Sequence, residues 1–306
     1  MGLWFVRFPL KSLLMHLPLK LNYSLAHFFS WFLYLILKKR RDIVTEEITR
    51  LFGEQMYEKD QKRVVRKSFT IFFKRQVENL LFGEFKKSQL DHITSIEGID
   101  NLNRALQDGK GVILLLSHFG SFLLPLPVLG YMGHKVFQVT GKPLLEGRNP
   151  IHKKLFKFRK TESDKLPIHF IVANRYLGPI VRALKSNSIV VIAFDGRTGD
   201  RWIQGKLFNR TAQFSPGPFN LALRTGAAIL PTFVVRRKDN KHRIIFEPRM
   251  KLEITTNKEE TLKINTIKYL WIFKRYLLNY PCHFAMTLYT VRNEAEKGLN
   301  RPLFVD

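Results

Sequence analysis

The sequence is poor in cysteine and lacks the short motifs of several enzyme classes. Cys282 is the only cysteine in 306 residues, which excludes an intramolecular disulfide framework and a cysteine-based zinc site. It also makes exposure to the cytoplasm the default expectation. The sequence contains no cluster of metal ligands, no glycine-rich nucleotide-binding loop and no nucleophile elbow. We therefore expect neither a metal nor a resident cofactor.

Acidic residues are also scarce, with 25 Asp and Glu against 51 Lys and Arg, for a net charge of +26. Because 45% of the residues are hydrophobic, the chain is not a disordered polycation and can bury a sizeable core. The excess of positive charge favours an anionic partner, either nucleic acid or a membrane surface. No helix-turn-helix, zinc-finger or aromatic RNA-binding motif accompanies the charge. We therefore expect an anionic membrane as partner, and no nucleic acid.

The sequence has no uncharged run that is clearly longer than the minimum length of a transmembrane helix. The best candidate, residues 21–37, reaches only the lower limit of a span of about 17–25 residues. Residues 1–20 mix aromatic and leucine side chains with Lys and Arg, as segments in the headgroup region do. We predict that residues 1–40 anchor the protein to a membrane. A buried core hairpin and a cleaved signal peptide are the alternatives, although no small-residue cleavage site follows the run.

The next segment, residues 41–93, is predicted to be helical and to pack on the domain that follows. Residues 42–53 and 59–83 carry apolar side chains at three- and four-residue spacing. In the second of these helices, basic residues occupy the positions between the apolar ones. This pattern indicates an amphipathic helix whose basic face contacts either solvent or lipid.

From residue 94 to 306, short apolar runs alternate with helical stretches. The alternation is typical of an α/β domain with a largely parallel central sheet flanked by helices, and the continuous hydrophobicity indicates that both sheet faces are covered. The predicted strands are 111–117, 135–140, 167–172, 189–194, 227–235 and 243–248. The predicted helices are 99–108, 121–130, 150–160, 174–186, 216–225 and 258–280. We assign no chemistry to the tail at 281–289.

Chemistry in such sheets is found at the carboxyl ends of the strands. His118 directly follows the predicted strand 111–117, and Gly120 lets the chain turn toward the next helix. An imidazole in this place is a candidate catalytic group because it exchanges protons near neutral pH, and a structural histidine is the alternative. Asp195 closes the predicted strand 189–194. Two parallel strand ends can face one crevice, although Asp195 before a glycine is also an ordinary turn residue.

Five stretches, including the one around His118, can be compared with a known family. They are KKRRDIVTEEITRLFG, GVILLLSHFGSF, VTGKPLLEGRNP, IVVIAFDGRTGD and GKLFNRTAQFSPGPFNLALRTGAAILPTFVVRR. In this order they resemble the lauroyl and myristoyl acyltransferases of lipid A biosynthesis, within the wider lysophospholipid acyltransferase group. The second stretch is similar to the family's strand-His-Phe-Gly-Asn-Trp-Glu signature. The resemblance extends from the predicted anchor to the terminal helix.

The resemblance implies transfer of a fatty acyl chain to a hydroxyl of a lipid A precursor or a similar glycolipid. The implied donor is a thioester of acyl carrier protein or of CoA, and the implied location is the cytoplasmic face of the inner membrane. His118 would be the general base, with a carboxylate five residues later to orient it. Lysophospholipid acyl transfer is a further alternative.

The sequence departs from the family pattern at the position of that carboxylate. Leu123 stands there, and a leucine accepts neither a proton nor a hydrogen bond. Either Asp195 has taken over the role, or the protein is a catalytically silent, lipid-binding relative of the enzymes. The first possibility requires the Asp195 carboxylate to lie within hydrogen-bond reach of the His118 ring.

Other residues are expected to contact substrate. Gly120 and Ser121 follow His118 in the motif that carries the resemblance. Lys142 and Arg148 bracket a turn after a predicted strand and are expected to hold a phosphate or an oxyanion. Arg224 lies at the end of a predicted helix, where acceptor binding and complementation of the helix dipole are both open.

Overall fold

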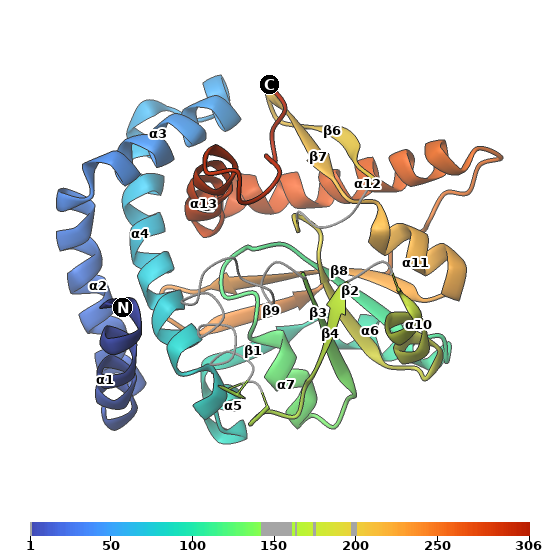
Figure 1. Ribbon diagram of the computed structural model, residues 1–306, viewed down its shortest axis with the longest axis horizontal. Coiled ribbons are helices and arrows are strands. Elements are labelled where there is room, and N and C mark those ends of the chain that lie inside the picture. Colours follow the sequence, from blue (N-terminus) through green and yellow to red (C-terminus); the bar gives the residue numbers. More distant parts are fainter. Residues whose placement is uncertain (1, 142–160, 163, 174–175, 197–200) are drawn as a thin grey trace.

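Seven strands form one central sheet in the computed structural model, which describes residues 2–141, 161–162, 164–173, 176–196 and 201–306. In order across the sheet, the strands are β1 (Thr94–Glu97), β9 (His242–Phe246), β8 (Ala228–Arg236), β2 (Val112–Leu116), β5 (Ile189–Ala193), β3 (Val136–Gly141) and β4 (His169–Ala173). A separate antiparallel hairpin consists of β6 (Ile203–Leu207) and β7 (Arg210–Phe214). Figure 1 shows the sheet across the middle of the molecule with helices on both sides.

The sheet is mostly parallel, as the sequence predicts. β2 pairs in parallel with β5 and with β8, and β3 pairs in parallel with β4 and β5. The antiparallel pair is β8 with β9, while β9 pairs in parallel with β1. The chain leaves β2 toward β3 on one side and leaves β5 toward β8 on the other. The carboxyl ends of β2 and β5 lie side by side at one edge of the sheet, which is the edge where such sheets carry their sites.

The helices divide between the two sides of the sheet. On one side, α10 (Gly178–Lys185), α11 (Gly217–Thr225), α12 (Lys258–Asn279) and α13 (Ala285–Glu296) share a hydrophobic core. On the other side lie α5 (Lys87–Ile93), α6 (Ile99–Gln107) and α7 (Pro125–Tyr131). β2 gives Ile113 and Leu115 to the first core and Val112, Leu114 and Leu116 to the second. Because successive strand residues point to opposite faces, a run of buried apolar residues fills both cores.

Four α-helices precede α5 and the first strand of the sheet. They are α1 (Gly2–His16), α2 (Leu19–Ile36), α3 (Lys38–Phe52) and α4 (Glu58–Leu80). α4 contacts α2, α3 and α13, and Figure 1 shows α1, α2 and α4 together along one side of the molecule. The predicted helices 42–53 and 59–83 are therefore present as α3 and α4, with α3 beginning a turn earlier.

Several elements differ from those predicted. The helix expected at 121–130 begins only at Pro125, because the segment before it is a turn that starts at Gly120, and the helix expected at 174–186 begins at Gly178. The helix expected at 150–160 lies outside the described residues. β1, the β6–β7 hairpin and α13 were not predicted. Their segments are short or mixed in polarity, and they gain order from tertiary packing rather than from a strong local pattern.

Many apolar side chains of the first two helices are exposed. Phe28 is 62% exposed, Trp31 54% and Ile36 55%, which rules out the alternative of a buried core hairpin. Among the described residues, none of the helices combines the length and the apolar character needed to cross a bilayer. The prediction that residues 1–40 anchor the protein to a membrane is therefore not confirmed by the structure of α1 and α2.

A buried ionic cluster joins α4 to the sheet and to α2. The carboxylate of Glu78 accepts hydrogen bonds from Arg236, from His242 Nε2 at 2.9 Å and from the Tyr23 hydroxyl at 2.7 Å. Its second oxygen accepts from the Ser121 hydroxyl. Burial raises the pKa of the Glu78 carboxyl, but the charges of Arg236 and His242 and the hydrogen bonds outweigh it, so the pKa lies well below its usual range.

We predict that Glu78→Gln lowers the free energy of unfolding by about 3–5 kcal/mol, because it leaves the Arg236 charge buried without a partner. Urea denaturation followed by circular dichroism measures the change. Glu58→Gln on the same helix is the control, since Glu58 is fully exposed. An unchanged midpoint in Glu78→Gln would contradict the structural role of the cluster.

The parent protein and Glu78→Gln can also be compared for the dependence of their stability on pH. A carboxyl with a lowered pKa in the folded state stabilises that state above the ordinary pKa of 4.5, and the stabilisation disappears as the pH falls below it. The difference in stability between the parent protein and Glu78→Gln should therefore narrow on acidification.

Candidate active site

His118 and Asp195 lie at the carboxyl ends of two neighbouring parallel strands. Leu116 at the end of β2 pairs with Ala193 at the end of β5. Beyond these two residues, Nδ1 of His118 lies 2.9 Å from Oδ1 of Asp195. The carboxylate can only accept, so the ring nitrogen donates its hydrogen. The structure thus places the carboxylate within reach of the ring, which is what a substitute for the acid missing at position 123 requires.

The backbone of His118 is held from both sides. Its N–H donates to the two Asp195 carboxylate oxygens at 3.1 and 2.9 Å, and its carbonyl oxygen accepts from the Thr287 hydroxyl at 2.6 Å. The Phe122 ring stands edge-on to the imidazole, with 4.7 Å between ring centroids. The histidine is therefore fixed at its N–H, its carbonyl and its ring, which is what a preorganised site requires.

These contacts determine which ring nitrogen of His118 carries the proton. Because Nδ1–H donates to Asp195, the lone pair of the neutral ring lies on Nε2. Nε2 makes no hydrogen bond to any residue that the structure describes. The Asp195 side chain is 1% exposed and that of His118 is 43% exposed. An imidazole oriented by a buried carboxylate in this way is able to accept a proton at Nε2.

Gly120 shapes the turn that follows His118. It has a positive φ of 57°, and a Cβ atom there would lie 2.2 Å from the carbonyl oxygen of Val234. Its N–H donates to the carbonyl oxygen of His283 at 3.0 Å. Only glycine combines this dihedral angle with such a close approach. Since its N–H is already bonded, the role of Gly120 in the structure is to form the turn, and its contact with substrate stays a prediction.

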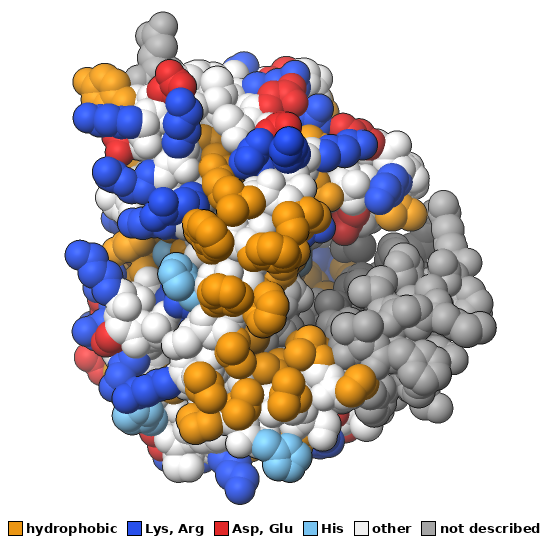
Figure 2. Space-filling view, turned by 90° about the vertical axis from the view of Figure 1, so that its left-hand side faces the viewer, with side chains coloured by type: hydrophobic (Ala, Val, Ile, Leu, Met, Phe, Trp, Pro, Cys, Tyr) orange, Lys and Arg blue, Asp and Glu red, His pale blue; other side chains and the backbone are white. Residues whose placement is uncertain are grey.

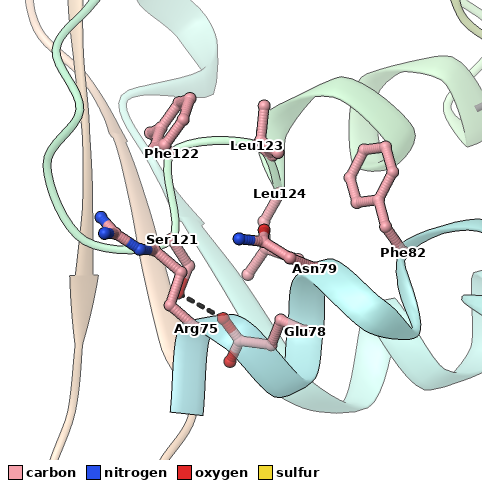
Figure 3. Close-up of a pocket in the computed structure, with 8 residues that line it drawn as sticks. All are labelled: Arg75, Glu78, Asn79, Phe82, Ser121, Phe122, Leu123 and Leu124. Atoms are coloured by element: carbon pink, nitrogen blue, oxygen red, sulfur yellow. Dashed lines mark hydrogen bonds between the residues drawn. The ribbon is translucent and has the colours of Figure 1, made fainter. Parts of the chain in front are cut away.

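Arg75 of α4 reaches the same turn. Its Nη1 donates to the carbonyl oxygen of Gly120 at 3.3 Å. Burial lowers the pKa of Arg75 to about 10, against the opposing charges of Glu78 and Asp195, so the guanidinium stays protonated at neutral pH. Figure 3 shows Arg75 in the lining of a small pocket, its guanidinium directed away from the Glu78 carboxylate.

Leu123 and Ser121 line the same pocket. The Ser121 hydroxyl donates to Glu78 and its side chain is buried, so the structure assigns it to the ionic cluster rather than to the expected substrate contact. Leu123 provides an apolar wall. The carboxylate that the family pattern puts at this position is thus missing here. Asp195 instead accepts the hydrogen bond from Nδ1 of His118.

The remaining predicted site residues are not brought to His118 by the described structure. Lys142 and Arg148 lie outside the described residues. Arg224 is exposed in the last turn of α11, just before β8 begins, and is therefore at the amino-terminal edge of the parallel strands. The expectation that Arg224 binds the acceptor is not supported by this position. Complementation of the helix dipole, the other interpretation, fits it.

Four residues of the site were missed in the sequence: Arg75, Glu78, Thr287 and His283. The first two lie on a helix predicted only as amphipathic, and the last two lie in or beside the tail to which no chemistry was assigned. His283 Nε2 accepts a hydrogen bond from the backbone N–H of Arg236 at 2.9 Å. Burial lowers the pKa of the His283 ring to about 3, so the ring is neutral. No local motif reveals these contacts.

Cys282 is excluded as a nucleophile. Burial raises the pKa of its thiol to about 11, so the reactive thiolate is scarce at neutral pH. Among the residues that the structure describes, no group of metal ligands comes together. The charged or titratable groups described at this edge include the imidazole of His118, the carboxylate of Asp195 and the guanidinium of Arg75.

The fold and the site together define a class: an α/β protein with a histidine–carboxylate pair at the carboxyl ends of two neighbouring strands of a mostly parallel sheet. The family model of the bacterial lipid A biosynthesis acyltransferases matches residues 1–277, and the chain belongs to that family. It is similar to the lipid A biosynthesis palmitoleoyltransferase of Escherichia coli (strain K12) and to the lipid A biosynthesis acyltransferase of Shigella flexneri. Each is 25% identical over 254 residues, which cover 78% of this chain and 79% of the relative.

Proposed function

We propose that the protein transfers a fatty acyl chain from a thioester to a hydroxyl group of a lipid A precursor, with His118 as general base and Asp195 as its positioning residue. The donor is a thioester of acyl carrier protein or of CoA. The observation that carries this proposal is the contact between Asp195 and Nδ1 of His118, which leaves Nε2 to accept a proton at the accessible side of the ring. Membership in the acyltransferase family supports the reaction type.

The reaction balances without a covalent enzyme intermediate. Nε2 of His118 removes the proton of the acceptor hydroxyl as its oxygen attacks the thioester carbonyl carbon. The buried carboxylate of Asp195 stabilises the imidazolium that forms. When the tetrahedral intermediate collapses, the carbon–sulfur bond breaks and the departing thiolate takes the proton from His118. The products are an ester and a free thiol.

We also propose that α1 and α2 lie on the cytoplasmic surface of the inner membrane. Figure 2 shows a band of hydrophobic side chains on the face that carries these helices, with Lys and Arg side chains beside it. The exposed apolar residues of α2 are Leu21, Phe28, Phe29, Trp31, Phe32, Leu35 and Ile36. An apolar face beside basic residues is suited to the boundary between acyl chains and anionic headgroups. Such a position would give the active site access to a lipid acceptor.

A catalytically silent, lipid-binding relative is the second candidate, and Leu123 is the observation that favours it. The contact between Asp195 and the ring weakens this alternative because it provides the orienting carboxylate from another strand. A lysophospholipid acceptor would require the same chemistry at His118. The family match favours the lipid A precursor.

His118→Ala should abolish acyl transfer and leave the fold intact. Loss of a general base lowers the rate by about 10² to 10⁴-fold, and the accessible ring contributes little to the core. Release of thiol from the thioester, together with mass spectrometry of the acylated acceptor, measures turnover. His92→Ala, at an exposed position on α5, is the control. Unchanged turnover in His118→Ala would remove this residue from the mechanism.

Asp195→Asn should lower kcat by up to about 10⁴-fold with little change in the KM for either substrate, because it disturbs the ring rather than a binding contact. Asp91→Asn, at an exposed position, is the matched control. Adding Leu123→Glu to Asp195→Asn should restore part of the rate, since it returns a carboxylate to the position that the family pattern uses. If kcat is unchanged in Asp195→Asn and also in the double variant with Leu123→Glu, Asp195 has no positioning role.

Replacing Phe28 and Trp31 together by Asp should release the protein from membranes. Each large side chain contributes about 1.5–3 kcal/mol when it is fully buried, so the partition coefficient should fall at least tenfold. Sedimentation with vesicles that contain anionic phospholipid measures it. Trp271→Asp on α12 is the control, since Trp271 is 68% exposed on a different element. Equal binding of both variants would contradict the assignment of this face to the membrane.

A further inference from the structure

Three consecutive residues, beginning with His118, contact the start of α13 or the short segment before it. The carbonyl oxygen of His118 accepts a hydrogen bond from the Thr287 hydroxyl at 2.6 Å. The Phe119 ring stacks on the His283 ring, with 5.2 Å between the ring centroids and 16° between the ring planes. The N–H of Gly120 donates to the carbonyl oxygen of His283 at 3.0 Å. The turn that carries the candidate base therefore contacts the carboxyl-terminal part of the chain at each of its first three residues.

This carboxyl-terminal segment is itself fixed to the sheet and to α12. Nε2 of His283 accepts a hydrogen bond from the backbone N–H of Arg236, the last residue of β8, at 2.9 Å. Phe284 is buried, and its ring stands edge-on to that of Phe273 on α12, with 5.2 Å between the ring centroids. Thr287 is 6% exposed in the first turn of α13. Because the segment has this support, Thr287 can hold another residue in place.

Thr287 and Asp195 hold opposite sides of the same residue. Asp195 accepts the backbone N–H that precedes the Cα atom of His118, and Thr287 donates to the carbonyl oxygen that follows it. Since each peptide group is a rigid plane, fixing the planes on both sides of a Cα atom fixes its two backbone dihedral angles and the direction of its side chain. The N–H of the second plane belongs to Phe119 and donates to the carbonyl oxygen of Ser117 at 2.6 Å, within the turn itself. Thr287 is therefore the contact that ties this plane to another element.

We infer that Thr287 is a positioning residue for His118, because its hydroxyl holds the peptide group after His118 and so keeps the imidazole between Asp195 and the acceptor hydroxyl. This inference rests on the proposed acyl transfer and adds a residue to the machinery of that reaction. Thr287 acts through His118 and exchanges no proton with either substrate. The family model matches residues 1–277, so Thr287 lies beyond the matched part of the chain, in the tail for which the sequence predicts no chemistry.

The first arm of the test measures turnover of the full-length protein with a thioester donor and a lipid A precursor. Thr287→Val removes the hydroxyl and keeps the branched shape of the side chain. We expect kcat to fall by up to about 10²-fold, the effect of a small displacement of a reacting group, while both KM values stay unchanged. Thr287→Ser keeps the hydroxyl and should recover most of the rate. The matched control is Thr290→Val, because the Thr290 hydroxyl bonds to the carbonyl oxygen of Met286 within the same helix.

The second arm measures the state of the His118 ring without turnover. Nitrogen NMR of the full-length protein, labelled at histidine, reports which ring nitrogen carries the proton. In Thr287→Val, the share of the neutral ring with its proton on Nδ1 should fall, because a displaced His118 loses its contact with Asp195. In Thr287→Ser and Thr290→Val, the His118 signals should match those of the parent protein.

A variant with a packing defect separates positioning from stability. Val291→Ala removes a buried side chain one turn further along α13 and should lower the stability of the protein. Its kcat is compared with that of Thr287→Val at a temperature where both variants are folded. An equal fall of kcat in the two variants would mean that the packing of α13, and not the Thr287 hydroxyl, is responsible.

The remaining outcomes distinguish the positioning role from the acyl transfer. Unchanged His118 signals in Thr287→Val would overturn the positioning role, whatever the rate, and so would a rise in KM without a fall in kcat. If the parent protein shows no turnover but Thr287→Val changes the His118 signals, the positioning role stands and the acyl transfer fails. If Thr287→Val does not fold, Thr287→Ala decides the question, because alanine also lacks the hydroxyl and has the highest helix propensity.

Discussion

The structure of the site depends on one carboxylate that bonds the same residue twice. Asp195 accepts the backbone N–H of His118 and also its ring Nδ1–H. The first contact fixes where the chain turns after β2, and the second fixes the ring in the tautomer that can remove a proton through Nε2. A carboxylate at the family's usual position would have to reach the ring from the turn itself. Asp195 reaches it from the neighbouring strand. The imidazole is therefore oriented although position 123 holds no acid.

The surrounding elements keep this contact in place. Parallel pairing of β2 with β5 brings the two strand ends together, and Thr287 of α13 holds the carbonyl oxygen of His118. Glu78 and its four partners fasten α4 to the sheet beside the turn. Because α4 is fixed in this way, Arg75 is held at Gly120 with no carboxylate bonded to it among the described residues. The same helix thus contacts the turn after His118 twice, through Glu78 and through Arg75.

The sequence predicts the parts of this arrangement that depend on local patterns. The central strands are continuous apolar runs, and His118 and Asp195 each follow one of them, so a parallel sheet is enough to place them together. Glu78, Arg75 and Thr287 are ordinary members of amphipathic helices, and only tertiary packing brings them to His118. Arg224 was a candidate for acceptor binding because it ends a predicted helix, but β8 starts after it and puts it at the opposite edge. Ser121 shows the converse, because its place beside His118 in the sequence is overridden by a bond to Glu78.

Nitrogen NMR of protein labelled at histidine tests most directly whether Asp195 determines the tautomer of His118. The spectrum is recorded where imidazole is neutral, and the His118 signals are assigned by their absence in His118→Ala. We expect that Nδ1 carries the proton in the parent protein and that Asp195→Asn loses this preference. A neutral His118 with its proton on Nε2 in the parent protein, or a spectrum unchanged by Asp195→Asn, would contradict this role of Asp195.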